Sequence, residues 1–178
     1  MKSLFDLTGR TILVTGGSRG IGFAMGAALA RHGATVVLNG RNEAKLEDKA
    51  RELRAEGLEA ETAVFDVNNE AAARSAMDKI VNKHGHLFGL INNAGIQHRS
   101  PILAFTTADF ERVVSTNLTS CFTLSREAIA LMSEHGSGRI INTVSMLGSQ
   151  ARPTVPAYIA AKEGLRALTR ALAVEAGP

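Results

Sequence analysis

The stretch Thr11-Ile-Leu-Val-Thr-Gly-Gly-Ser-Arg-Gly-Ile-Gly22 decides the fold of this chain. Its first four residues form a β-branched, apolar run that is typical of a strand covered on both faces. Gly16, Gly20 and Gly22 follow, and an uncharged pattern over residues 21–32 then predicts a helix. Glycine here permits a tight turn and lets backbone N–H groups approach a pyrophosphate, which the positive end of the helix also attracts. The alternative is that the glycines only make a turn, and their Gly-x-x-x-Gly-x-Gly spacing differs from the commoner dinucleotide fingerprint.

Short apolar runs and longer helical patterns alternate along the rest of the chain. Strands are expected at residues 11–14, 36–38, 62–65, 87–91 and 139–144, and helices at 21–32, 43–56, 69–84, 107–135 and 157–175. This alternation and the right-handed crossover rule predict a three-layer, doubly wound Rossmann-type α/β fold with parallel strands in the order 3-2-1-4-5. We find no interdomain linker, so one dinucleotide-binding domain is expected over residues 1–178.

The composition excludes several classes of protein. The 178 residues carry a net charge of +3, and their lysines and arginines are scattered, which argues against a nucleic-acid partner. Cys121 is the only cysteine, so no intrachain disulfide or cysteine metal cluster can form, and no metal is expected. The first residues do not resemble a signal peptide, and no apolar stretch is long enough to span a membrane. We therefore expect a cytoplasmic protein with a small-molecule substrate and no membrane or nucleic-acid partner.

The end of the second expected strand indicates which nicotinamide cofactor is preferred. An acidic residue at this point usually binds the ribose of NAD, but Val37-Leu-Asn-Gly-Arg41 has no carboxylate. Arg41, together with Arg19 of the glycine-rich turn, could hold the 2′-phosphate of NADP. We therefore expect NADP(H) in preference to NAD(H). The alternative is that Arg41 is a surface residue at the start of the next helix.

Two further segments are expected to contact the cofactor. Asp66, which follows the third expected strand, could accept a hydrogen bond from the adenine amino group or could cap the next helix. The small residues after Asn92 would let the backbone approach a ribose, although they could also form a simple turn. The full set of predicted cofactor-binding residues is Gly16, Ser18, Arg19, Gly20, Ile21, Gly22, Arg41, Asp66, Val67, Asn93, Ala94, Gly95, Tyr158 and Lys162.

Four residues together predict the chemistry. Tyr158 and Lys162 are four residues apart in a helical pattern, so their side chains share a face. A free tyrosine titrates near pH 10, and an ammonium about 4 Å away would stabilise its phenolate by about 4 kcal/mol at an effective dielectric of about 20. Ser145 could bind the substrate oxygen, and Asn117 could orient a water that links Lys162 to solvent. Each residue alone fits a structural role, but the four in this order predict proton and hydride transfer between a nicotinamide cofactor and a carbonyl or alcohol.

With these motifs the chain resembles the short-chain dehydrogenase/reductase family over residues 4–178. The resemblance implies that Tyr158 is the acid/base, that Lys162 assists it and holds the nicotinamide ribose, that Ser145 positions the substrate and that Asn117 completes a proton relay. It also implies a homodimer or homotetramer formed through the helices at 107–135 and 157–175.

Several stretches resemble the gluconate 5-dehydrogenases within this family, and they imply that the substrate is gluconate or 5-ketogluconate. They are Leu4-Phe-Asp-Leu-Thr-Gly-Arg10, Val37-Leu-Asn-Gly-Arg41, Asn92-Asn-Ala-Gly-Ile-Gln97 and Ala151-Arg-Pro-Thr154. Arg99 and Arg152 are candidate carboxylate anchors, or else solvated surface arginines. The alternative enzyme is a 3-oxoacyl-thioester reductase of the same family.

The end of the chain departs from the resemblance. Members of the family usually continue to roughly 250 residues, within the range of one-domain α/β chains. The run at 139–144 would be an edge strand here, yet it has no lysine, proline or bulge signal to protect it. We therefore expect a domain that is incomplete at its C-terminus and lacks the family's last two strands. A truncated, non-catalytic nucleotide-binding or interaction module is then a further alternative.

Overall fold

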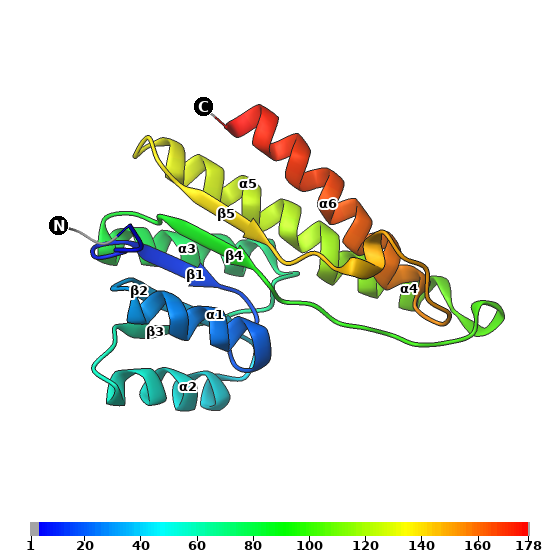
Figure 1. Cartoon of the computed structure of the whole chain (residues 1–178), viewed down its shortest axis with the longest axis horizontal. Helices are drawn as coiled ribbons and strands as arrows, with labels where there is room; N and C mark the ends of the chain where they lie inside the picture. The colour runs from blue at the N-terminus through cyan, green and yellow to red at the C-terminus, as the bar shows by residue number, and fades with distance from the viewer. Residues whose placement is uncertain (1–3, 178) are drawn as a thin grey trace.

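The apolar run at the start of the chain forms the central strand β1 (Thr11–Val14) in the computed structural model, which describes residues 4–177. Its sheet has five parallel strands in the order β3-β2-β1-β4-β5, so the predicted fold is confirmed (Figure 1). Residues 1–3 and residue 178, which the predicted domain includes, lie outside the described part. The other strands are β2 (Thr35–Gly40), β3 (Ala60–Val64), β4 (Gly89–Asn92) and β5 (Arg139–Asn142).

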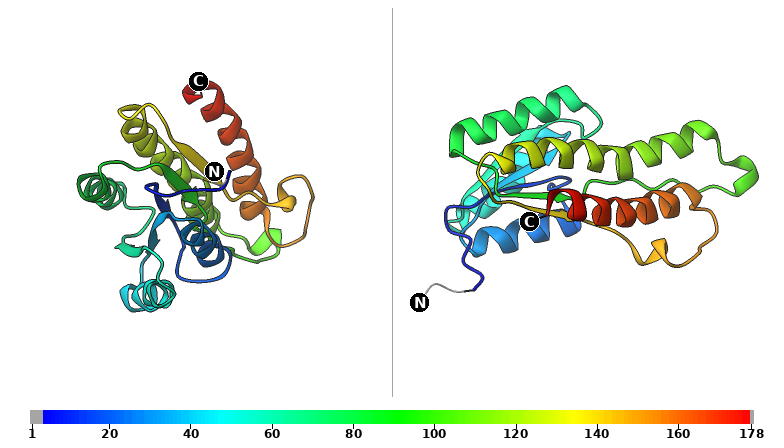
Figure 2. Two further views of the ribbon diagram at one scale, coloured as in Figure 1. Left: turned by 60° about the vertical axis from the view of Figure 1, so that its left-hand side comes forward. Right: turned by 90° about the horizontal axis from the view of Figure 1, so that it is seen from above.

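Helices cover both faces of this sheet, which is why the central strands are continuous apolar runs. One cluster of buried side chains joins the sheet to α1 (Gly20–Arg31) and α2 (Glu43–Ala55). A second cluster joins the opposite face to α3 (Glu70–His84) and α5 (Ser120–Ser133). Figure 2 shows the three layers edge-on in its right-hand view. The parallel connections place the carboxyl ends of all five strands along one rim, where a ligand site is expected.

The predicted helix over residues 107–135 is wrong in one respect, because it is not continuous. It consists of α4 (Thr107–Val114), a π-helical turn (Ser115–Thr119) and α5. The wide turn contains the fully buried Asn117. Its side chain hydrogen-bonds to the backbone of Ile96, in the loop that follows β4. That contact is made outside the helix, so the helical periodicity of the sequence could not reveal it.

The last part of the chain lies beyond β5. A short 3₁₀ turn (Met146–Gly148) and a loop lead to α6 (Pro156–Ala176), which packs chiefly against α4 and the π-helical turn. β5 is the sheet's outer strand on this side, and Ile141 is 53% exposed on it. Among residues 4–177, no helix has the length and apolar character that crossing a membrane requires.

Candidate active site

The glycine-rich turn is fastened to the end of β4. Thr15, buried directly after β1, donates its hydroxyl to the carbonyl of Ile91 and accepts the N–H groups of Asn93 and Ala94, each at 3.0 Å. The Asn93 amide donates in return to the carbonyl of Thr15 at 3.0 Å. Thr15 was not among the predicted site residues. Its position between a buried strand and the first glycine was the only available signal.

Two glycines in this turn have no room for a side chain. Gly16 has a φ of +64°, and a Cβ there would lie 3.0 Å from the Cα of Ala94. A Cβ on Gly22 would lie 2.4 Å from the carbonyl oxygen of Gly16. The first glycine is therefore required by its conformation and the second by close packing of the helix on the turn.

A cleft with a volume of about 600 Å³ opens at the rim of the sheet beside this turn. Its walls come from the ends of β1, β2, β3 and β4 and from α4 and the π-helical turn. It brings together these predicted cofactor-binding residues: Gly16, Ser18, Arg19, Gly20, Ile21, Arg41, Asp66, Val67, Asn93, Ala94 and Gly95.

Some of the cleft's residues were missed by the sequence prediction, and some predicted residues do not line it. Gly22 lies beneath the turn, and Tyr158 and Lys162 are on α6. The residues missed are Asn39, Gly40, Phe65, Asn68, Ile96, Arg112 and Thr116. Asn39, Gly40 and Phe65 could have been found as strand-end neighbours. Arg112 and Thr116 gave no signal, because they come from the segment expected to be a plain helix.

The charged residues at the far end of the cleft are arranged partly as predicted. Arg41 and Asp66 face each other, with 3.6 Å between the guanidinium nitrogen and the carboxylate oxygen. Asp66 accepts the backbone N–H of Asn68 at 2.9 Å, and Asn69, not Asp66, caps α3. The capping alternative for Asp66 is therefore wrong. Its second carboxylate oxygen lies toward Arg41 in the cleft.

Lys162 is a buried cation on α6 beside Tyr158. Its ammonium donates to the carbonyl of Thr143 at 2.5 Å and lies 5.8 Å from the centre of the Tyr158 ring. The side chain of Lys162 is only 5% exposed. Burial lowers the pKa of Lys162 below its usual value, and nearby Cys121 opposes the shift only in part. The helix therefore brings the tyrosine and the lysine together, while their roles stay predictions.

The other two candidate catalytic residues have structural partners. Both polar atoms of the Asn117 side chain bond to the backbone of Ile96, with each bond 2.8 Å long. Ser145 accepts the N–H of Leu147 at 3.2 Å, so it caps the 3₁₀ turn and its own hydroxyl hydrogen remains available to donate. The Asn117 side chain therefore fastens the π-helical turn to the wall of the cleft, and a part for this residue in a proton relay stays a prediction.

The two candidate carboxylate anchors lie on different loops. Arg99 is exposed and donates to the Gln97 side chain at 3.2 Å. Arg152 is exposed and has no hydrogen-bond or ion-pair partner among residues 4–177. Figure 1 shows the two loops at the end of the molecule where α4 and the start of α6 meet. Both guanidinium groups are therefore exposed, and Arg99 uses only one of its nitrogens to bond to Gln97.

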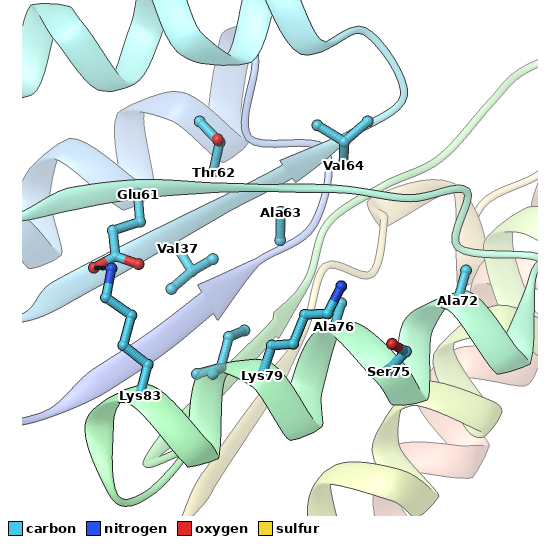
Figure 3. A pocket seen from close by; sticks show the side chains of 11 residues that line it. Val37, Glu61, Thr62, Ala63, Val64, Ala72, Ser75, Ala76, Lys79 and Lys83 are labelled. Atoms are coloured by element: carbon cyan, nitrogen blue, oxygen red, sulfur yellow. Dashed lines mark ion pairs between the residues drawn. The ribbon is translucent and has the colours of Figure 1, made fainter.

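A second hollow, of about 370 Å³, lies between β3 and α3 (Figure 3). Its floor is apolar, and at its rim Lys83 pairs with Glu61 at 2.8 Å. None of the predicted site residues lines it. The cleft at the rim of the sheet, which most of the predicted cofactor-binding residues line, therefore remains the candidate site.

A parallel sheet with a glycine-lined cleft at its carboxyl rim defines a dinucleotide-binding α/β protein. The chain belongs to the short chain dehydrogenase family, whose profile matches residues 10–178. The enzymes of this family are NAD(P)-dependent oxidoreductases.

The sequences of individual relatives align with nearly the whole of this chain. A gluconate 5-dehydrogenase of Gluconobacter oxydans (strain 621H) is 41% identical, over 98% of this chain and 68% of its own length. A 3-oxoacyl-(acyl-carrier-protein) reductase of Pseudomonas aeruginosa is 36% identical, over 97% and 70%. The crystal structure of a gluconate 5-dehydrogenase from Burkholderia cenocepacia J2315, in complex with NADP and tartrate, matches with a TM-score of 0.91 and 40% identity, over 96% of this chain and 67% of that one. The chain therefore spans about two thirds of the length of these relatives.

Proposed function

We propose that this protein is an NADP(H)-dependent oxidoreductase that interconverts a hydroxyl and a keto group on a small sugar acid, with gluconate and 5-ketogluconate as the favoured pair. The observation that carries the proposal is the combination of a cleft lined by Arg19 and Arg41 with a buried lysine beside Tyr158. Similarity to the gluconate 5-dehydrogenases supports the choice of substrate.

The cleft fits a dinucleotide because of the space that its glycines leave. Gly20 lines the cleft and leaves open space where a side chain would stand, and Gly16 and Gly22 keep the turn compact because a side chain at either would collide with neighbouring backbone. Arg19 and Arg41 would hold the 2′-phosphate, and the N-terminal end of α1 would face the pyrophosphate. The ion pair with the Asp66 carboxylate would orient the Arg41 guanidinium toward the phosphate. When bound, NADPH supplies the hydride.

The protein's own residues would handle the proton. Tyr158 would donate its hydroxyl proton to the keto oxygen during reduction, while Ser145 donates a hydrogen bond to the same oxygen. Lys162 would stabilise the resulting phenolate from beneath, because its buried ammonium is already held by the carbonyl of Thr143. Arg99 and Arg152 would bind the substrate carboxylate and fix its orientation.

The direct test is the oxidation of NADPH, followed at 340 nm, by the purified chain with 5-ketogluconate. A matched assay with a 3-oxoacyl thioester addresses the alternative enzyme, which similarity to the Pseudomonas reductase favours. Turnover of the thioester alone would contradict the sugar-acid assignment. Tight NADP binding with no turnover of either substrate would instead identify a non-catalytic nucleotide-binding module.

We also propose that residues 1–178 form one dinucleotide-binding domain and that copies of the protein associate through α4, α5 and α6. Apolar side chains that support such an interface include Phe110 and Phe122, which are 39% and 42% exposed. Chemical cross-linking of the purified protein tests this. A dimer or tetramer that is disrupted by Phe122→Asp is expected, and an unaffected oligomer would place the interface elsewhere.

A further inference from the structure

Thr154 has an unusual backbone conformation. Its φ is +70°, and it is the one non-glycine residue with a positive φ among residues 4–177. A β-branched residue is strained in this region because its Cβ crowds the backbone. Such strain persists only where the surrounding structure enforces it, and it is concentrated at functional sites. The structure must therefore contain something that holds Thr154 in place.

Two contacts hold it. The carbonyl of Thr154 accepts the backbone N–H of Ser100 at 3.0 Å. On its other side, Val155 is fully buried and Pro156 begins α6. The buried valine and the helix fix the chain after Thr154, and the hydrogen bond from Ser100 fixes its carbonyl, so the positive φ sets the direction of the loop residues that precede it.

This hydrogen bond joins the two loops that flank the candidate site. Ser100 directly follows Arg99, and Thr154 lies between Arg152 and Tyr158 in the sequence. The bond therefore links the two candidate anchors to one another and links both to the start of the helix that carries Tyr158. Both arginines are exposed, so the backbone of the two loops sets how far apart their side chains begin.

We propose that Thr154 is a positioning residue whose strained peptide clamps these two loops and so sets the spacing of Arg99 and Arg152 for a small carboxylic acid. The inference rests on the proposed function, and it names the backbone contact that would make the site selective for a carboxylic acid. The clamp acts through backbone atoms, so the hydroxyls of Ser100 and Thr154 play no part in it. Breaking the clamp should weaken acid binding by loosening the loops and should leave the cofactor cleft unchanged, because neither residue lines that cleft.

The test uses two variants that remove the clamp from opposite sides. Ser100→Pro deletes the donor N–H, and Thr154→Pro excludes the positive φ, because proline holds φ near −65°. The matched controls, Ser100→Ala and Thr154→Val, keep the backbone bond and remove only the hydroxyl. Calorimetry in the presence of saturating NADP measures the binding of tartrate and of 5-ketogluconate to the full chain. Amide hydrogen exchange shows whether the Ser100 N–H is protected by its hydrogen bond. Unchanged NADP affinity shows that each variant is folded.

Both proline variants are expected to lose about tenfold in acid affinity with unchanged NADP affinity, and both controls are expected to bind as the wild type does. The Ser100 amide should be protected in the wild type and unprotected in Thr154→Pro. The proposal is overturned if the amide is unprotected in the wild type, if the proline variants bind acid like their controls, or if the controls lose as much affinity as the prolines. A protected amide in a wild-type protein that binds neither acid would uphold the clamp and refute the acid-binding function instead.

Discussion

At the scale of single residues, the cofactor end of the cleft depends on charge. Arg41 is an exposed guanidinium whose described ion-pair partner is Asp66, at 3.6 Å. An exposed pair of this kind contributes little to stability, so the arginine is free to serve a ligand. β2 itself ends without a carboxylate, and the carboxylate beside Arg41 is that of Asp66, which follows β3.

Replacing Arg41 by alanine should weaken NADPH binding by about tenfold to a hundredfold, because a charge-assisted hydrogen bond to the 2′-phosphate contributes about 1.5–3 kcal/mol. NADH binding should change little. Fluorescence titration of both cofactors measures the difference. Arg51→Ala, on the exposed surface of α2, is the control. Equal losses for the two cofactors would show that Arg41 does not select between them.

Tyr158→Phe should lower the turnover of 5-ketogluconate by about a hundredfold or more, since the variant lacks the proton that the hydroxyl supplies. NADPH affinity should persist, because the aromatic ring stays in place beside Lys162. Initial rates and cofactor titration on the same preparation separate the two effects. Turnover near the wild-type rate would remove Tyr158 from its proposed role.

Lys162 should make stability depend on pH. Burial lowers its pKa in the folded protein, so the unfolded chain binds the proton more tightly. The charged form therefore costs stability at neutral pH, and this cost disappears as pH rises through the lowered pKa of the folded state toward the usual lysine pKa of 10.5. Urea unfolding at several pH values should show wild type gaining stability relative to Lys162→Met as pH rises. A constant difference between the two proteins would contradict the shift.

At the scale of elements, the π-helical turn between α4 and α5 links two parts of the site. Asn117 bonds both backbone groups of Ile96, which lines the cleft. A regular α-helix over this segment would orient the following residues differently. The irregular turn is therefore part of how the cleft wall is held.

Asn117→Ala should lower the free energy of unfolding by about 2–3 kcal/mol, because two buried hydrogen bonds are lost and the Ile96 groups are left without partners. Urea denaturation measures this. Thr119→Ala is the matched control, because Thr119 lies on the exposed side of the same turn. A loss no larger than that of the control would mean that the Asn117 side chain does not stabilise the turn.

At the scale of the whole molecule, the two edges of the sheet differ. β3 pairs with β2 and has a salt bridge between Glu61 and Lys83 beside it, whereas β5 exposes Ile141 and has a single charged residue, Arg139, at its start. An unprotected apolar edge is a template for pairing with another chain. The edge at β5 is therefore a second candidate surface for association, besides the one proposed on α4, α5 and α6.

We expect the isolated chain to self-associate through this edge. Ile141→Lys should reduce the association, because a charged residue disfavours edge-to-edge pairing. Sedimentation velocity over a range of concentrations measures it. Val64→Lys on the opposite edge strand is the control, since Val64 is 47% exposed there. A monomeric wild-type chain with cooperative unfolding would show that the β5 edge needs no partner.

The sequence alone was sufficient for the order of the elements and for most of the residues that line the cleft. Buried strands, glycine turns and helical periods are local patterns, and the crossover rule turns them into one sheet. Parallel strands end at a common rim, so residues that follow strands, such as Asp66 and Asn93, could be placed there together. The pairing of Tyr158 with Lys162 followed from helical spacing alone.

Tertiary structure decided everything that depends on contacts between distant segments. The π-helical turn is held by hydrogen bonds between Asn117 and Ile96, and Arg112 of α4 lines the cleft beside residues of the distant glycine-rich turn. Likewise, the strain at Thr154 is held by Ser100 from another loop. Such contacts leave no periodic trace, because each is fixed by packing in three dimensions and not by the preferences of neighbouring residues.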